Sequence, residues 1–340
     1  MSNKDFGNYL KQCISLTEKD NLEILVSFHQ TSNSENQDKT NKYYTLPPRI
    51  FDKYLLCGFC NIDQEEIINL AKEFDKFIKY YVVDLEKKGV VGLSKNNKKL
   101  ITGNLEGRLE DVVNRRKILG IRFDSLTADH VVNLLIKENP FLYKYSILIV
   151  GLGKIGYKIA SSLLECGNNI EIYSRNYQKV FEKCNCMDIL KPSSTLARPI
   201  PHRKLESSLI DKDIIILATN SINILNSMNS KLIDNSARII SIGHGEVSQE
   251  ALVDLNKRNI AFSRVDIGKS LVEYIKRLLD KNEILPKKKI INGKTYVSGG
   301  FLGSPDDIVV DDADNPHLIY GFINDDSIFI RELSFYGNKN

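Results

Sequence analysis

The feature that most constrains this chain is a glycine-rich turn set between an apolar strand and a helix. Tyr145 to Val150 reads Tyr-Ser-Ile-Leu-Ile-Val and predicts a buried strand. Gly151-Leu-Gly153-Lys-Ile-Gly156 follows it, and helix-forming residues then continue to about Cys166. A second strand is predicted at Ile170 to Tyr173. The pattern is therefore strand, glycine turn, helix, strand, which is the start of a parallel α/β sheet.

The three glycines have separate physical roles in such a turn. Gly151 permits the tight turn, Gly153 lets a pyrophosphate approach the backbone, and Gly156 lets the helix pack closely on the strand. Lys154 and Ile155 begin the helix, whose free N–H groups favour phosphate. The spacing in this context predicts a dinucleotide site. The alternative is that the glycines serve only a tight turn.

Alternating strands and helices continue beyond this turn. Further strands are predicted at residues 213–218, 238–242 and 261–265, with helices between them. Apolar strands of this kind predict an α/β fold with a doubly wound parallel Rossmann sheet and a second, smaller α/β domain. We expect a substrate or partner domain at 1–120, an NAD(P)-binding domain at 121–290, and a C-terminal segment at 291–340 that returns to the first domain.

The flanking regions carry weaker patterns. In the first 120 residues, the sequence predicts a strand at 22–28, an exposed loop at 32–42, a helix at 64–80 and a strand at 81–85. A helix is expected at 125–137, capped by Asp124, Ser125 or Thr127. Near the C-terminus, 318–322 and 327–330 predict a hairpin.

The choice of cofactor is read at the end of the second strand. Ser174-Arg175-Asn176 stands where an acid would bind the ribose of NAD, and Glu171 lies too early to do so. A hydroxyl followed by a guanidinium suits a 2′-phosphate, so the sequence favours NADP over NAD. The alternative is that Arg175 is an ordinary surface charge.

Two later loops end at the same edge of the sheet. Ala218-Thr219-Asn220 follows one strand, and Gly243-His244 follows the next. Both are expected at the ribose and nicotinamide, because ligands of such sheets bind at the carboxyl ends of the strands. His244 is the acid–base candidate, since imidazole titrates near neutral pH. The alternative is a histidine that only binds ribose or backbone.

The stretch Ala237 to Leu252, with its Ile242-Gly243-His244, is similar to one in D-2-hydroxyacid dehydrogenases and in S-adenosylhomocysteine hydrolase. The hydrolase is the closer of the two, and Lys99, Asn104 and the loop 299–305 resemble its segments. The resemblance implies a bound nicotinamide cofactor and a cleft residue at Lys99 that assists proton transfer. It departs at Gly103, Ser174 and Ser304, where the hydrolase has an Asp, an acid and a His, so hydrolysis is not implied. An exposed Lys99 in a polar turn is the alternative.

Composition excludes several classes. The 340 residues carry 47 basic and 43 acidic side chains, a balance too even to indicate nucleic acid as a partner. There is no apolar run of membrane-spanning length and no leader pattern, so we expect a cytoplasmic protein that binds a small molecule, with homo-oligomerisation left open. Cys57-Gly-Phe-Cys60 has the spacing of a zinc or redox site, and Cys184-Asn-Cys186 could supply two more ligands. The second pair is separated by one residue and not by two, as a matching zinc knuckle would need, so we expect ordinary thiols.

Three hypotheses of function follow. The leading one is an NAD(P)-dependent oxidoreductase acting on a small polar metabolite between its domains, with hydride passing to or from the cofactor. The second is a cofactor-binding module or sensor without catalysis. The third is a glutamyl-tRNA reductase-like enzyme, which would need a nucleophilic Cys57 or Cys60 and a more basic surface.

Overall fold

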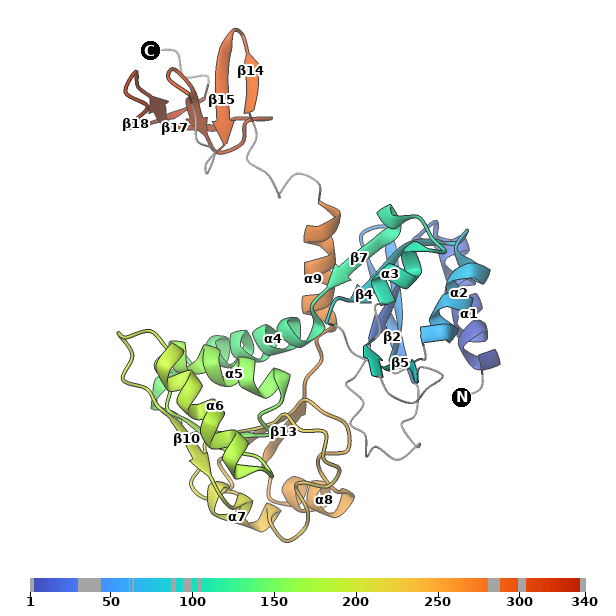
Figure 1. Ribbon diagram of the computed structural model, residues 1–340, viewed down its shortest axis with the longest axis vertical. Helices are drawn as coiled ribbons and strands as arrows, with labels where there is room; N and C mark the ends of the chain where they lie inside the picture. Colours follow the sequence, from blue (N-terminus) through green and yellow to red (C-terminus); the bar gives the residue numbers. More distant parts are fainter. Residues whose placement is uncertain are drawn as a thin grey trace. The chain divides into compact units, whose positions relative to one another are not determined.

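The computed structural model describes residues 3–29, 44–60, 62, 64–86, 90–93, 100–102, 105–280, 288–298 and 304–336. The chain forms two compact units, Met1–Tyr274 and Ile275–Asn340 (Figure 1). The division into 1–120, 121–290 and 291–340 stays a prediction. In the described residues, no helix has the length and apolar character needed to cross a membrane.

The first unit begins with a five-stranded sheet in the order β2-β3-β1-β4-β7. All neighbouring strands are parallel except β2 and β3, which form an antiparallel edge. The predicted strands at 22–28 and 81–85 are present within this sheet, while the predicted loop at 32–42 lies outside the described residues. The strands are β1 Glu23–His29, β2 Tyr44–Phe51, β3 Tyr54–Cys60, β4 Ile78–Asp84 and β7 Ile118–Ile121.

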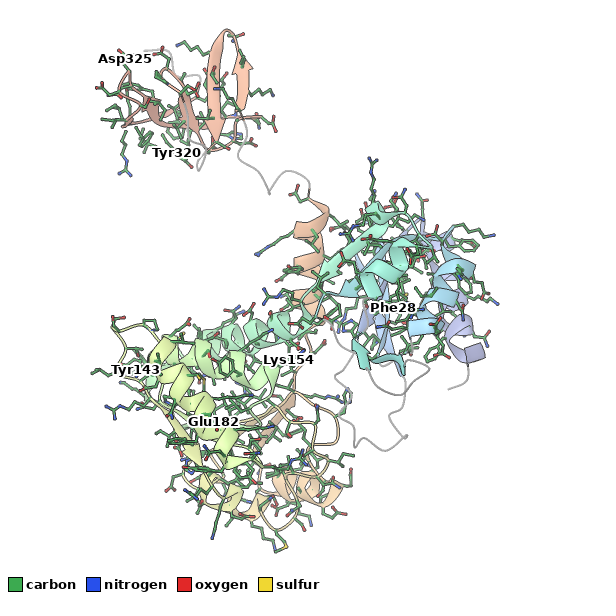
Figure 2. All side chains as sticks on the ribbon, in the orientation of Figure 1. Phe28, Tyr143, Lys154, Glu182, Tyr320 and Asp325 are labelled. Carbon is green, nitrogen blue, oxygen red and sulfur yellow. The ribbon has the colours of Figure 1, made fainter. Side chains whose placement is uncertain are left out.

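Helices α1 Asn3–Asp20, α2 Gln64–Phe74 and α3 Leu105–Glu110 share one hydrophobic core with this sheet. At its centre Phe28, labelled in Figure 2, stacks on Phe59 with 5.8 Å between ring centroids. The predicted helix over 64–80 was wrong in its last six residues. Helix α2 ends at Phe74, and Ile78 begins β4, where it pairs with Ile24. The residues Ile78 to Tyr80 therefore belong to the strand that was predicted to begin at Tyr81, and the helical spacing before them concealed its start.

Helix α4, Phe123–Glu138, follows β7 and confirms the helix predicted at 125–137. Its predicted caps were wrong. The N-cap position is Arg122, which makes no side-chain cap bond, and the Asp124 N–H instead donates to the Glu86 carboxylate at 2.7 Å. The same carboxylate accepts a bond of 2.7 Å from Lys158. A residue 38 positions away thus replaces the local cap.

The second sheet of this unit is wholly parallel, with six strands in the order β10-β9-β8-β11-β12-β13. Numbered from its first strand, this is the order 3-2-1-4-5-6 of a Rossmann sheet. The predicted strands are confirmed to within two residues at their ends. They are β8 Ile147–Val150, β9 Ile170–Tyr173, β11 Ile214–Leu217, β12 Arg238–Ser241 and β13 Ala261–Arg264. The sixth strand, β10 Pro199–His202, was not predicted.

Two hydrophobic cores cover the opposite faces of the second sheet. Alternate residues of β8 separate into them, Ile147 and Ile149 on one face and Leu148 and Val150 on the other. The first core includes residues of α4, α5 Lys154–Glu165 and α6 Tyr177–Leu190, and the second includes residues of α7 Leu205–Ser208 and α8 Gln249–Lys257 (Figure 1). The predicted doubly wound sheet is therefore confirmed.

The second unit holds a five-stranded sheet in the order β14-β15-β16-β17-β18. The predicted hairpin is confirmed as antiparallel β17 and β18. Helix α9, Gly268–Leu279, spans the boundary between the units. The remaining strands are β5 Val90–Leu93 and β6 Leu100–Thr102 of the first unit, and β14 Lys288–Ile291, β15 Lys294–Ser298, β16 Ile308–Val310, β17 Leu318–Ile323 and β18 Phe329–Phe335 of the second.

Candidate functional site

The glycine turn between β8 and α5 has the geometry that its spacing predicts. Gly151 has φ +104°, and a Cβ there would overlap the carbonyl oxygen of Ala218. A Cβ on Gly156 would overlap the carbonyl oxygen of Gly151, so helix and turn are in direct contact. A Cβ on Gly153 would meet nothing within 4 Å. Two glycines are therefore required by the fold, whereas the third leaves an open space beside the backbone.

Gly153 is the N-cap residue of α5 and is exposed. Lys154, labelled in Figure 2, is the exposed first residue of the helix, and Ile155 after it is half-buried. Lys183 of α6 donates to the Leu152 carbonyl at 2.6 Å, which fixes the turn from the next helix. The first turn of α5 therefore presents N–H groups, with the charge of Lys154 in the same turn and that of Lys183 from α6 at the glycine turn, a setting that suits a phosphate.

The end of β9 carries the residues predicted to select the cofactor. Ser174 is half-buried, Arg175 is exposed, and the Asn176 side chain accepts the Lys179 N–H at 3.0 Å, which caps α6. Because β9 and β10 pair Tyr173 with His202, the residue after β10 lies beside Ser174. That residue is Arg203, whose guanidinium carbon lies 4.2 Å from the centroid of the Tyr177 ring.

Glu171 is engaged elsewhere. Its carboxylate lies 2.5 Å from His202 Nε2 and 2.6 Å from Lys212 Nζ. Glu171 itself lies two residues before the end of β9. Ser174, Arg175 and Asn176 after β9, and Arg203 after β10, are therefore polar groups that remain at the carboxyl end of these strands.

Glu246 joins the two later loops. Its carboxylate accepts the Thr219 N–H at 2.8 Å, the Gly243 N–H at 2.9 Å and the Ser241 hydroxyl at 2.6 Å, and its side chain is buried. Burial raises the pKa of Glu246 above its ordinary value, against these three donors, which lower it. Ala218 is half-buried beside Gly151, and Asn220 is exposed. One buried carboxylate thus fixes the positions of both loops that the sequence assigned to the cofactor.

His244 is exposed at the tip of the second of these loops. Its Nδ1 accepts a hydrogen bond from Arg264, the last residue of β13. Partial burial, and then the charge of Arg264, hold the pKa of His244 below its ordinary value. A neutral imidazole is therefore the favoured form at neutral pH.

The other predicted residues fall into two groups. Lys99 and Asn104, and residues 299–303 of the loop from the resemblance, lie outside the described residues. Cys57 belongs to the core of the first sheet and Cys184 to that of the second. A hydrogen bond with Cys13, and then burial, raise the pKa of Cys57 well above its usual range, which opposes a nucleophilic thiolate.

Sequence reasoning missed four residues of this edge, which are Lys183, Arg203, Glu246 and Arg264. Glu246 lies in the loop after β12, which the sequence assigned to the cofactor, and its carboxylate accepts the N–H of Gly243, three residues earlier. The others approach from a neighbouring strand or helix. The only sequence signal for Arg203 and Arg264 is their place at the ends of β10 and β13.

No family model and no curated protein matches this chain. Among solved structures, a dipicolinate synthase from Bacillus halodurans aligns over 76% of this chain and 98% of its own, with 11% identity and a TM-score of 0.36. A shikimate dehydrogenase in complex with NADP+ aligns over 72% and 85%, with 14% identity and a TM-score of 0.40. The NAD form of a D-isomer specific 2-hydroxyacid dehydrogenase from Lactobacillus delbrueckii ssp. bulgaricus aligns over 60% and 63%, with 13% identity and a TM-score of 0.29.

The third of these structures belongs to one of the two families that the resemblance named. All three TM-scores lie below 0.5, so the fold is assigned from the chain's own strands. The parallel order 3-2-1-4-5-6, two covered faces and a glycine turn after the first strand define it. Residues 147–264 therefore form a Rossmann-type sheet, the fold shared by NAD(P)-binding dehydrogenases.

Proposed function

We propose that this protein is an NAD(P)-dependent oxidoreductase whose cofactor binds at the carboxyl edge of the second sheet. The observation that carries the proposal is the open space at Gly153, between two glycines that the fold itself requires. A pyrophosphate against Gly153 would receive the N–H groups of α5. When bound, the nicotinamide would supply the hydride chemistry.

The chain's own residues would position the reactants. Glu246 holds the backbone of Thr219 and Gly243, so both loops are ordered before a ligand arrives. His244 lies at the tip of the second loop, where it would contact a substrate oxygen. The substrate would be a small polar metabolite. Lys99 is proposed as a second contact, on the resemblance alone.

The cofactor is proposed to be NADP in preference to NAD. Arg175 and Arg203 stand at the ends of neighbouring strands, and Arg203 lies against the Tyr177 ring. Two guanidinium groups beside Ser174 suit a 2′-phosphate, which would receive charge-assisted hydrogen bonds from them. With Glu171 engaged by His202 and Lys212, it is not the acid that would bind an NAD ribose.

Cofactor binding is tested by titrating the full chain with NADPH and NADH and following nicotinamide fluorescence. Gly153→Val should abolish binding and lower the unfolding temperature only slightly, because a side chain there meets nothing in the fold and only the N-cap of α5 is weakened. Arg203→Leu should weaken NADPH about tenfold or more and leave NADH nearly unchanged. Arg198→Leu, an exposed arginine just before β10, is the matched control.

Oxidation and reduction are then measured by nicotinamide absorbance on hydroxy acids, amino acids and nucleosides. The proposal expects turnover of at least one class. Turnover of nucleosides would favour a hydrolase-like cycle, as the resemblance implies. Unaltered binding in Gly153→Val would contradict the cofactor site, and binding without turnover on a broad panel would favour a non-catalytic module.

A further inference from the structure

The parallel pairing of β12 and β13 places an arginine beside His244. Ser241, the last residue of β12, pairs with Arg264, the last residue of β13. The loop after β12 turns back through Gly243, so His244 comes within reach of the neighbouring strand's end. The Arg264 guanidinium donates a hydrogen bond to His244 Nδ1. The contact thus depends on strand order and not on closeness in sequence.

This contact fixes the chemical form of the imidazole. A guanidinium has only donors, so the nitrogen that it contacts must accept and cannot carry a hydrogen. A neutral imidazole with Nδ1 as acceptor carries its hydrogen on Nε2. Protonation of Nδ1 would place its N–H against the N–H groups of the guanidinium. It would also place the positive charge of the imidazolium against the positive charge of Arg264. The imidazolium form is therefore disfavoured, and with it the Nδ1–H tautomer.

The carboxylates nearest in the chain are engaged with other partners. Glu246 accepts from Thr219, Ser241 and Gly243. Asp266 binds Arg49 at 2.7 Å and accepts the Gly268 N–H at 2.8 Å. Lowering of the His244 pKa, caused by burial and by Arg264, agrees with this arrangement of charges.

We propose that Arg264 is a positioning residue that holds His244 as a neutral imidazole with its hydrogen on Nε2, so that His244 donates a hydrogen bond to a substrate oxygen and does not act as a general base. The role toward substrate rests on the proposed oxidoreductase function. The assignment of the tautomer does not, because it is argued from the strand register and the Arg264 contact. The sequence analysis named His244 as an acid–base candidate, and the proposed tautomer restricts it to the role of hydrogen-bond donor. An N–H on Nε2 polarises a carbonyl group without removing a proton.

The tautomer is tested by ¹⁵N NMR on the full chain labelled at histidine, with the His244→Asn variant used to assign the signals. We expect the ¹⁵N chemical shifts of His244 to be those of the Nε2–H tautomer, and the pKa of His244 to lie below the ordinary value of about 6.5. Arg264→Leu should raise that pKa toward the ordinary value, with the part caused by burial remaining, and should weaken the tautomer preference. Arg264→Lys, which keeps a donor and a charge, should restore both in part.

Arg238→Leu is the matched control, because Arg238 begins β12 at the opposite edge of the sheet and pairs with Glu138. It should leave the His244 signals unchanged. An Nδ1–H tautomer in the unaltered chain would overturn the proposal. So would a His244 pKa that is the same in the unaltered chain and in Arg264→Leu.

The activity measurement separates this inference from the proposed function. With a turned-over substrate, the acidic limb of kcat/KM should move to higher pH in Arg264→Leu, by the same shift as the His244 pKa, because only neutral His244 is active. An acidic limb that stays at the same pH in Arg264→Leu would overturn the proposed role of His244 toward the substrate. Absence of turnover with the Nε2–H tautomer intact would contradict the oxidoreductase and leave the tautomer established.

Discussion

The two sheets of the first unit are built from similar parallel strands but use glycine in opposite ways. In the first sheet, Gly58 lies within β3, where a Cβ would overlap the side chains of Ser27 and Leu46 and lie 3.2 Å from the Ser27 carbonyl oxygen. In the second, a Cβ on Gly151 in the turn after β8 would overlap the Ala218 carbonyl, and a Cβ on Gly156 in α5 would overlap the Gly151 carbonyl. Side chains can rotate away from such an overlap, whereas backbone carbonyls cannot. Glycine in the first sheet therefore lets side chains pack over the strands, as at Gly58 and at Gly120 against Leu85, whereas Gly151 and Gly156 in the second let backbone segments touch beside the open space at Gly153.

The largest expected effect is that of Gly156→Ala. Its methyl group would overlap the Gly151 carbonyl, so we expect a loss of about 3 kcal/mol in unfolding free energy, at the upper range for overpacked sites. Gly58→Ala should cost only about 1 kcal/mol, because the Ser27 and Leu46 side chains can rotate. Urea denaturation followed by circular dichroism measures both. Equal losses would break the distinction between side-chain and backbone contacts.

A smaller loss is expected from Glu246→Gln. The amide has one oxygen in place of two, so one of the Thr219, Ser241 and Gly243 donors would face an NH₂ group. A buried donor without an acceptor costs about 2 kcal/mol. Glu23→Gln in the first sheet, where Lys79 and Lys53 are partly exposed, should cost about 0.5 kcal/mol. The same denaturation series compares them, and a larger effect at Glu23 would contradict the bridging role of Glu246.

The smallest effects are the pH dependences of these two carboxylates, which should have opposite signs. Burial raises the pKa of Glu246, so its stabilising contribution is present below the unfolded value of about 4.5 and is lost as pH rises through the folded value. Burial opposes the lowering of the Glu23 pKa, but hydrogen bonds from Lys79 and Lys53 outweigh it. The contribution of Glu23 is therefore present above about 4.5 and lost as pH falls through the folded value.

Unfolding free energies of the unaltered chain and the two glutamine variants, measured between pH 3 and 7, check these signs. The difference from Glu246→Gln should shrink as pH rises, and the difference from Glu23→Gln should grow. Slopes of the same sign would show that the two carboxylates do not differ in environment as described.

Most of the second sheet was predictable because its signals are local. The five predicted strands are short runs rich in apolar residues, and the turn at Gly151 to Gly156 defines the first strand–helix unit through backbone sterics alone. β10 was not predicted, because its four residues include two prolines and a histidine. Prediction failed where local signals conflicted. Ile78 continues the helical spacing of the residues before it, and only the pairing of Ile78 with Ile24 of β1 makes it part of a strand. The cap of α4 was also misread, since its acceptor is the distant Glu86.

In the candidate site, too, some features follow from local sequence signals and others from contacts between distant residues. By itself the sequence determined which residues end each strand, and so placed Gly153, Ser174, Arg175 and His244 at one edge, because carboxyl ends of parallel strands lie together. Only the tertiary structure decided that Glu246 bonds two loops, that Arg203 lies against Tyr177, and that Arg264 contacts His244. These contacts depend on which strands are neighbours and in what register they pair. That is settled by packing of the whole sheet, and no short stretch of the chain encodes it.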